Sequence, residues 1–203
     1  EADIVISAGN TGALLVVSKL NLKMIENIDK PALSALWPNK KGMSVVLDLG
    51  ANIECSSKNL FDFSIMGASL YKSLYPNETP NVALLNIGSE ELKGNETIKE
   101  TFKIMNEKKS DDFNFSGYIE GNELMNGDVN VIISDGFTGN VALKTAEGTA
   151  NFITDELKKA LQGTLLGKIS SLLNISNLKK FKKRLDPRLY NGAIFIGLDS
   201  PVV

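Results

Sequence analysis

Residues 133–144 read ISDGFTGNVALK, and residues 6–17 read ISAGNTGALLVV, with the same Ser, Gly, Thr and Gly in register. Each copy continues a run of β-branched residues, DIVIS from Asp3 and NVIIS from Asn130. Each therefore predicts a strand, a glycine-rich turn and the first turn of a helix. Backbone N–H groups at such a turn can surround an anion, and phosphate is the simplest candidate.

The same alternation of strands and helices continues along the chain and predicts an α/β fold with a mostly parallel sheet. We expect strands at residues 4–7, 44–47, 81–85, 114–119, 129–133 and 193–197. We expect helices at residues 12–22, 60–74, 97–108 and 141–161. Four strands run into small or polar turns, at residues 8–12, 48–52, 86–96 and 135–140. The carboxyl ends of parallel strands form the ligand-binding edge of open α/β sheets, so we expect these turns to converge on one cleft.

Composition limits the class of protein. The chain has 203 residues, of which 43% are hydrophobic, enough for a single domain with one sizeable core. Cys55 is the single cysteine, and no apolar run approaches the roughly 20 residues that cross a bilayer. We therefore expect a cytoplasmic location. The chain opens at a predicted strand without a Met, so we also expect that its natural N-terminal part is missing.

The chemistry is limited by what the sequence lacks. There is no histidine, and neither GxxxxGK[ST] nor GxGxxG occurs, which argues against His-based hydrolysis, His-ligated metal, a P-loop and a dinucleotide fingerprint. We expect no metal and no cofactor. Phosphate attack on a thioester remains, because the substrate supplies the nucleophile and a thiol of pKa about 8.5 leaves readily. Cys55 is expected to be a small core residue, and the glycine-rich turns have the alternative interpretation of being only tight turns.

Five motifs together resemble the bacterial phosphate acyltransferase (PlsX) family, and the resemblance extends over essentially the whole chain. They are SAGNTGALL from Ser7, DLGAN from Asp48, NIGSEELKGNE from Asn86, DVNVIISDGFTGNVALKTAEG from Asp128 and YNGAIFIGLDSPVV from Tyr190. The resemblance implies transfer of a fatty acyl group from acyl carrier protein to inorganic phosphate, giving acyl phosphate for phospholipid synthesis. It also implies a three-layer α/β/α sandwich similar to phosphotransacetylases and isocitrate dehydrogenases, and a homodimer.

Carrying the motifs over residue by residue places two residues at the reaction. Lys93 would bring a positive charge to phosphate or to the developing oxyanion, and Asn140 would donate its amide hydrogens to the same centre. Lys144 follows Asn140 by one helical turn, with Glu147 as its orienting partner. The expected phosphate-binding rim consists of Asn10, Thr11, Gly12, Asp48, Asn52, Glu91, Asp135, Thr138, Gly139 and Lys144. The alternative role of Glu91, with Glu90, is a simple charge at a helix start.

Basic residues gather near the C-terminal end of the chain. Residues 158–188 hold nine basic residues and one acidic residue, whereas the rest holds 13 basic and 23 acidic residues. Such asymmetry suggests an anionic partner. Residues 157–187 also carry leucines at helical spacing, which predicts a protruding basic amphipathic helical hairpin with a turn at residues 174–177.

We interpret this hairpin as a dimer interface, a carrier-protein dock or a contact with anionic membrane, and the dimer and membrane roles can coexist if the helix bases pair and their tips touch the bilayer. Acyl phosphate is an amphiphile that must reach a downstream membrane acyltransferase, so we expect peripheral membrane contact and no nucleic acid. The residues expected to make the contact are Leu165, Leu172, Leu173, Lys179, Lys180, Lys182 and Lys183. Two other functions stay open: a short-chain phosphotransacetylase that uses coenzyme A, and a noncatalytic phosphate- or lipid-binding protein.

Overall fold

The computed structural model of the chain describes residues 3–185 and 192–203, except for the side chains of Leu165, Arg184 and Leu185. The chain divides into two compact units, residues 1–140 with 192–203, and residues 141–191. The first unit contains the sheet, and the second is helical.

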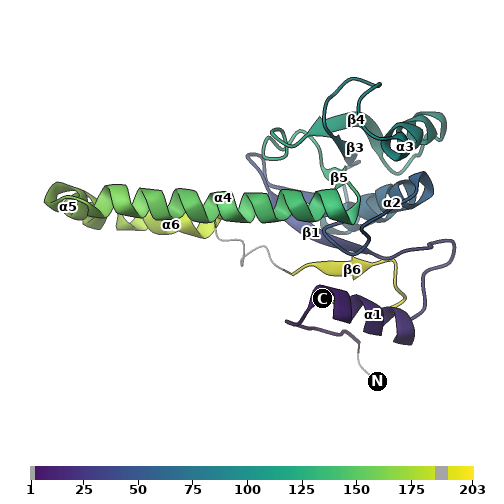
Figure 1. Cartoon of the computed structure of the whole chain (residues 1–203), viewed down its shortest axis with the longest axis horizontal. Coiled ribbons are helices and arrows are strands. Elements are labelled where there is room, and N and C mark those ends of the chain that lie inside the picture. The colour runs from purple at the N-terminus through teal and green to yellow at the C-terminus, as the bar shows by residue number, and fades with distance from the viewer. Residues whose placement is uncertain (1–2, 186–191) are drawn as a thin grey trace. The chain divides into compact units, whose positions relative to one another are not determined.

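The sheet of the first unit has six strands in the order β4-β3-β5-β2-β1-β6 (Figure 1). Their bounds are β1 Ala32–Pro38, β2 Met43–Leu47, β3 Asn81–Asn86, β4 Asn114–Glu120, β5 Val131–Ile133 and β6 Ile194–Ile196. Strands β4, β3, β5 and β2 are parallel neighbours, while β1 runs antiparallel to both β2 and β6. The expected mostly parallel sheet is confirmed, with one antiparallel strand that was not expected.

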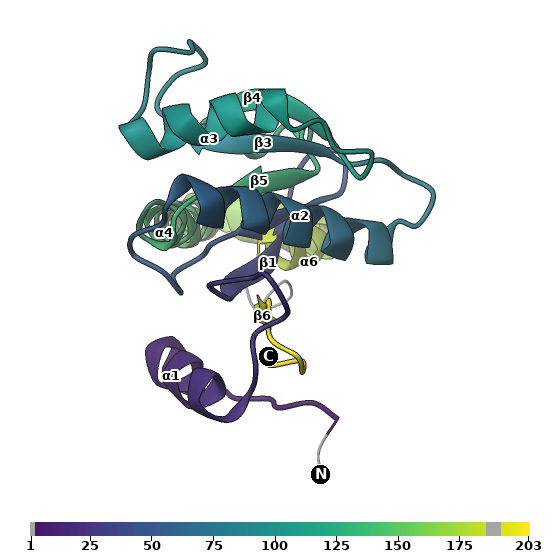
Figure 2. The ribbon, with the colours of Figure 1, turned by 90° about the vertical axis from the view of Figure 1, so that its right-hand side faces the viewer.

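Helices α2, Ser57–Leu74, and α3, Glu96–Glu107, lie side by side in front of the sheet in the view of Figure 2. A reciprocal pair of bonds fixes the start of α2: Asn59 N donates to Ser56 Oγ and Ser56 N donates to Asn59 Oδ1. Beneath the helices, buried Phe63 and Leu60 of α2 share one core with Val45, Val82 and Val131 of three neighbouring strands. Helix α1, Thr11–Asn21, lies beyond the β6 edge of the sheet in Figures 1 and 2.

Most expected elements are confirmed with small shifts at their ends, but residues 4–7 do not form a strand of the sheet. They pair only with the last residues of the chain: Ser7 N donates to Val203 O at 2.8 Å, and Val203 N donates to Val5 O at 2.8 Å. Strand β1 was not expected at all. Its sequence ALSALWP lacks a two-residue alternation, because the buried positions run consecutively from Ala32 to Ser34.

Helix α4, Gly136–Gln162, begins in the first unit and continues into the second, which also holds α5, Leu165–Leu173, and α6, Ile175–Leu185. Thr164 begins α5, accepting a hydrogen bond from Gly167 N at 3.0 Å. A single residue, Asn174, separates α5 from α6, so the expected turn at residues 174–177 is wrong in length. Across the described residues, every helix is too short or too polar to cross a bilayer.

Candidate active site at the carboxyl edge of the sheet

Three of the four glycine-rich turns meet at one edge of the sheet. They follow β2, β3 and β5, which are parallel neighbours in the order β3-β5-β2. Their carboxyl ends therefore point the same way, and the loops at residues 48–56, 87–95 and 134–135 lie next to one another. The fourth turn, at residues 8–12, precedes α1, which lies beyond β6.

Asp48 holds the first of these loops together. Its Oδ1 accepts hydrogen bonds from Leu33 N, Gly50 N and Ala51 N at 2.9–3.2 Å, and its Oδ2 accepts from Asn52 N at 2.7 Å and Asn52 Nδ2 at 2.8 Å. The side chain is fully buried, and burial raises the pKa of its carboxyl although these hydrogen bonds lower it. Asp48 therefore shapes the loop and does not face the rim.

Asn52 is also used inside the loop, because its Nδ2 donates to Pro31 O at 2.7 Å as well as to Asp48. Its carbonyl oxygen accepts from Gly136 N at 2.7 Å, which ties the loop after β2 to the start of α4. The polar side-chain atoms of two residues expected at the rim, Asp48 and Asn52, are thus bonded within the loop.

The start of α4 packs unusually closely against the loop after β2. A Cβ atom at Gly139 would lie 1.9 Å from the Asp48 carbonyl oxygen, and one at Gly136 would lie 2.6 Å from the Asn52 carbonyl oxygen. No side chain fits at either position, which explains why the DLGAN and DGFTGN motifs occur together. The close approach also brings the side chain of Asn140 against Gly50, where a Cβ atom would lie 3.5 Å from Asn140 Cβ.

Three amide groups at the start of α4 have partners within the protein. Thr138 N donates to Asp135 Oδ1 at 2.7 Å, Gly139 N donates to Asp135 O at 2.9 Å, and Gly136 N donates to Asn52 O. The Thr138 hydroxyl is also bonded to Asp135, at 3.1 Å. These three N–H groups are therefore used within the protein, and anion binding at this turn stays a prediction. Asn140 is exposed, and no described residue is hydrogen-bonded to its side chain.

Asn86 and Asn95 organise the loop between β3 and α3, a role that was not expected from the sequence. Buried Asn86 donates from Nδ2 to Gly88 O and Lys93 O, both at 3.1 Å, and Asn95 Oδ1 accepts from Ile98 N at 2.9 Å to cap α3. Gly94 has a φ of 97°, which permits the close approach of the loop to Asn86. The signal for the cap was present in the sequence, since Asn95 directly precedes the helical pattern.

Lys93 lies at the tip of this loop and is paired with an acid. Its Nζ is 3.1 Å from Glu90 Oε1, and at least half of each side chain is exposed. The pKa of Glu90 is lowered, first by its own backbone N–H and then by Lys93. Glu91 is exposed. An anion that binds Lys93 would therefore have to compete with Glu90 for its ammonium group.

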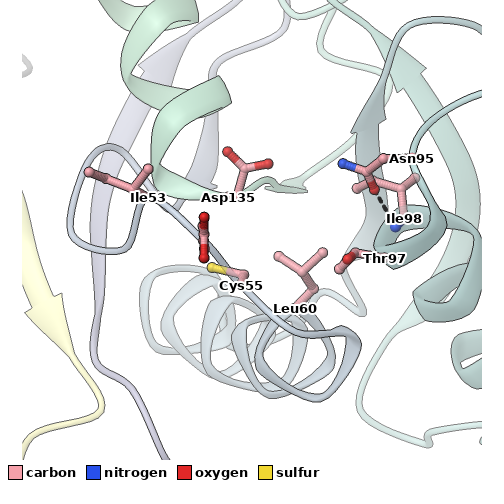
Figure 3. A pocket seen from close by; sticks show the side chains of 8 residues that line it. Ile53, Cys55, Leu60, Asn95, Thr97, Ile98 and Asp135 are labelled. Atoms are coloured by element: carbon pink, nitrogen blue, oxygen red, sulfur yellow. Dashed lines mark hydrogen bonds between the residues drawn. The ribbon is translucent and has the colours of Figure 1, made fainter.

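The three loops enclose a cavity of about 280 Å³ (Figure 3). It is lined by Ile53, Glu54, Cys55, Leu60, Asn95, Thr97, Ile98 and Asp135. Burial, followed by the charge of Asp48, raises the pKa of the Cys55 thiol to about 11, which disfavours a thiolate nucleophile, as expected from the sequence. No cluster of His, Cys, Asp or Glu among residues 3–185 and 192–203 is suited to hold a metal ion.

The remaining candidates are Asn10, Thr11 and Gly12 around the start of α1, and Lys144 on α4. Asn10 caps α1 by accepting from Ala13 N at 3.1 Å, and it does not line the cavity, nor do Thr11 and Gly12. Lys144 lies in the second unit and is paired with Glu147 at 2.9 Å, the orienting partner expected for it.

The candidates for membrane or partner contact are in the second unit. Leu172 and Leu173 end α5 with 75% and 82% of their surface exposed. The side chain of Leu165 lies outside the described residues. The four lysines Lys179, Lys180, Lys182 and Lys183 are on α6, and all four are exposed.

Curated relatives of the chain are named phosphate acyltransferase. The protein of Pelagibacter ubique (strain HTCC1062) is 82% identical over 203 residues, which is all of this chain and 61% of that protein. The protein of Rhizobium leguminosarum bv. trifolii (strain WSM2304) is 45% identical over the whole chain and 58% of its own length. The chain thus spans about three fifths of the length of these relatives.

Solved structures support the fold. A phosphotransacetylase from Streptococcus pyogenes matches 99% of this chain and 56% of its own, with a TM-score of 0.62 and 15% identity. EutD phosphotransacetylase from Staphylococcus aureus matches 99% of this chain and 56% of its own, with a TM-score of 0.60 and 17% identity. The expected three-layer α/β fold of phosphotransacetylase type is confirmed.

The family assignment follows from the whole length of the chain. Residues 1–203 match the sequence model of the family described as "Fatty acid synthesis protein". No part of the chain is left outside that match, and the curated relatives align over the same full length. The chain belongs to the fatty acid synthesis protein family.

Proposed function

We propose that the complete protein is a phosphate acyltransferase, which transfers a fatty acyl group from acyl carrier protein to inorganic phosphate. The product, acyl phosphate, would enter the synthesis of phosphatidic acid and other phospholipids. The observation that carries this proposal is the 82% identity, over the whole chain, to a protein named phosphate acyltransferase. Membership of the fatty acid synthesis family agrees with an acyl substrate.

The reaction needs no nucleophile from the protein. A phosphate oxygen attacks the thioester carbonyl carbon, a C–O bond forms, and the C–S bond breaks with its electron pair leaving on sulfur. The thiolate then takes up a proton from water, and a thiol pKa of about 8.5 makes it a competent leaving group without a strong general acid. The protein has to place phosphate beside the carbonyl and stabilise the negative oxygen of the intermediate.

Asn140 and Lys93 are suited to these two tasks. The Asn140 amide is exposed at the start of α4 and has no described hydrogen-bond partner, so its two N–H groups are available to an oxyanion. Lys93 lies on the adjacent loop, and an approaching phosphate would compete with Glu90 for its ammonium group. Asp48, Asn52 and Asp135 act through the loops that hold these residues in place.

Formation of acyl phosphate by the full-length protein tests the proposal. Lys93→Ala and Asn140→Ala should each lower kcat by about 10² or more, the usual cost of losing one oxyanion donor. The exposed Lys103→Ala and Asn106→Ala on α3 serve as matched controls. Near-parental turnover in both site variants would remove them from the mechanism, and a parent that forms no acyl phosphate would refute the function.

A short-chain phosphotransacetylase that uses coenzyme A is the second candidate, because solved neighbours with this fold are named phosphotransacetylase. Turnover of an acyl carrier protein thioester should exceed turnover of the coenzyme A thioester with the same chain. The opposite preference would favour the second candidate.

We further propose that the protein is a homodimer and that α5 and α6 contact anionic membrane from the cytoplasmic side. The exposed Leu172 and Leu173 and the four exposed lysines of α6 are the groups that an anionic lipid surface recognises. Such contact would deliver acyl phosphate to a membrane acyltransferase. Binding to anionic vesicles should weaken with salt and in the double variant Leu172→Glu, Leu173→Glu, while the dimer persists. Equal vesicle binding by parent and variant would contradict the membrane role.

A further inference from the structure

The cavity between the three loops has walls of unlike chemistry. Figure 3 shows Asp135 and Cys55 on one side and Asn95, Thr97 and Ile98 on the opposite side. Apolar atoms of Leu60, Ile98 and Ile53 line it, together with one amide, one hydroxyl, one thiol and two carboxylates. Five of the eight lining side chains carry an oxygen, nitrogen or sulfur atom, so the cavity offers several hydrogen-bonding groups beside a small apolar surface.

Free phosphate does not match this cavity. The side chains of Glu54 and Asp135 are both acidic, and no lysine or arginine is among the lining residues. Lys30, which influences Cys55 electrostatically, donates from Nζ to the Glu54 carbonyl oxygen and does not line the cavity. A phosphate group carries a charge of about −1.5 to −2 at neutral pH, so two nearby carboxylates would repel it.

A neutral group with amide hydrogen-bonding capacity matches the cavity better. Asn95 uses its Oδ1 to cap α3, and Figure 3 shows its side-chain nitrogen directed toward the cavity, where it can donate to a carbonyl oxygen. The Asp135 carboxylate on the opposite side accepts one hydrogen bond at each oxygen from Thr138, and each oxygen has a further lone pair for an amide N–H. The cavity volume of about 280 Å³ lies at the lower end of ligand sites, so it suits a slender arm rather than a whole fatty acyl chain.

We propose that this cavity receives the neutral, amide-bearing arm that carries the thioester, and that phosphate binds outside it, toward Asn140. The inference rests on the proposed acyl transfer. The thiol arm is chemically the same in acyl carrier protein and in coenzyme A, so the cavity recognises a feature that both donors share. The two substrates would then have separate sites: the donor arm between the loops after β2 and β3, and phosphate at the start of α4.

Bulky substitutions in the cavity test this separation in the full-length protein. Cys55→Phe places an aromatic ring in the cavity from the α2 side, and Thr97→Phe does so from the α3 side, so two variants approach the same volume from opposite walls. Asn106→Phe is the matched control, because it adds the same ring at an exposed position of α3 that does not line the cavity. We expect KM for the acyl donor to rise at least tenfold in both cavity variants, while KM for phosphate stays within twofold of the parent. Asn106→Phe should retain both values.

Both acyl donors should respond in the same way to the bulky substitutions. The KM increase should appear with the acyl carrier protein thioester and with the coenzyme A thioester, since the arm is common to both. An increase for only one donor, an increase in KM for phosphate that exceeds that for the donor, or unchanged donor KM in both folded bulky variants would overturn the inference. Unfolding midpoints of the variants show whether they are folded.

A binding measurement separates this inference from the proposed function. Titration of the full-length parent with coenzyme A in a calorimeter requires no turnover. Binding that is lost in Cys55→Phe and Thr97→Phe, and that is unaffected by added phosphate, supports the cavity assignment. Competition by phosphate for the same site would overturn it, whether or not the protein forms acyl phosphate.

Discussion

The same substitution, glycine to alanine, should have opposite effects at two positions of α4. At Gly139 the new Cβ would lie 1.9 Å from the Asp48 carbonyl oxygen and 2.6 Å from Ser134 Oγ, whereas Cβ contacts below 3.0 Å are essentially never observed. The Asp48 oxygen belongs to a buried backbone and cannot rotate away, so helix and loop must separate by more than 1 Å. Overpacking of this kind typically costs about 1–3 kcal/mol and occasionally more, and we expect about 3 kcal/mol for Gly139→Ala.

Gly148 is the matched control because a Cβ there would meet nothing within 4 Å. Alanine has the higher helix propensity, so Gly148→Ala should stabilise α4 by up to about 1 kcal/mol. Urea unfolding followed by circular dichroism measures both variants, and the fluorescence of Trp37, which is buried, reports on the first unit. With a slope of about 1–3 kcal/mol/M, the midpoint of Gly139→Ala should fall by roughly 1–3 M. A midpoint equal to that of Gly148→Ala would refute the close contact between α4 and the loop after β2.

Two further substitutions test buried polar groups. Tyr118→Phe removes a buried hydroxyl that has no hydrogen-bond partner among the described residues, so the free energy of unfolding should stay constant or rise. Tyr71→Phe is the comparison, because it removes hydrogen bonds to Glu78 at 2.6 Å and to Asn130 at 2.9 Å. It should lower the free energy of unfolding by about 1–3 kcal/mol. Equal effects of the two substitutions would contradict the assigned contacts. Asp48 should add a pH dependence. Burial raises its folded-state pKa above the ordinary 3.8, so the folded state binds the proton more tightly, and this contribution to stability is lost as pH rises through the folded pKa. Asp48→Asn should lack that component of the stability–pH curve, and identical slopes for parent and variant would show that the carboxyl is not perturbed.

The antiparallel strand β1 shows what periodicity does not reveal. Alternation of strands with helices predicted the parallel neighbours β2, β3, β4 and β5 because each is followed by a helix or a polar turn. Strand β1 leads directly into β2 through residues 39–42, and consecutive residues at its start are buried, so no two-residue pattern marks it. Strand direction is set by the length of the connection, and the sequence motifs do not encode it locally.

The duplicated turn illustrates a second limit. The two copies align by sequence, but Asn10 caps α1 through Ala13 N, whereas Asp135 caps α4 through Thr138 N. Relative to the alignment, α4 therefore begins two residues earlier than α1. The matching residues predicted the same local turn in both copies, but the two turns cap their helices at different positions and pack against different parts of the chain. Gly139 is required because the Asp48 carbonyl oxygen approaches it, and a distant residue of this kind leaves no trace in the local pattern.

The sequence predicted which loops meet at the carboxyl edge of the sheet, but it did not show which of their side chains are bonded within the protein and which are exposed. The loops after β2, β3 and β5 were identified correctly as a cluster of Asp, Asn and Gly residues. Within that cluster, Asp48 and Asn86 direct their polar atoms at neighbouring backbone groups, because a buried loop must pair its own N–H and C=O groups before it can bind anything else. Asn140 has the same kind of side chain as Asn86 but lies exposed on a helix, with its amide left over after the fold is satisfied. Residue type alone therefore does not distinguish the side chains that are bonded within the loops from those that are exposed. The Asp48 carboxylate is buried and used by its own loop, whereas the Asn140 amide is exposed and has no hydrogen-bond partner among the described residues, which is why we propose phosphate at Asn140 and not at Asp48.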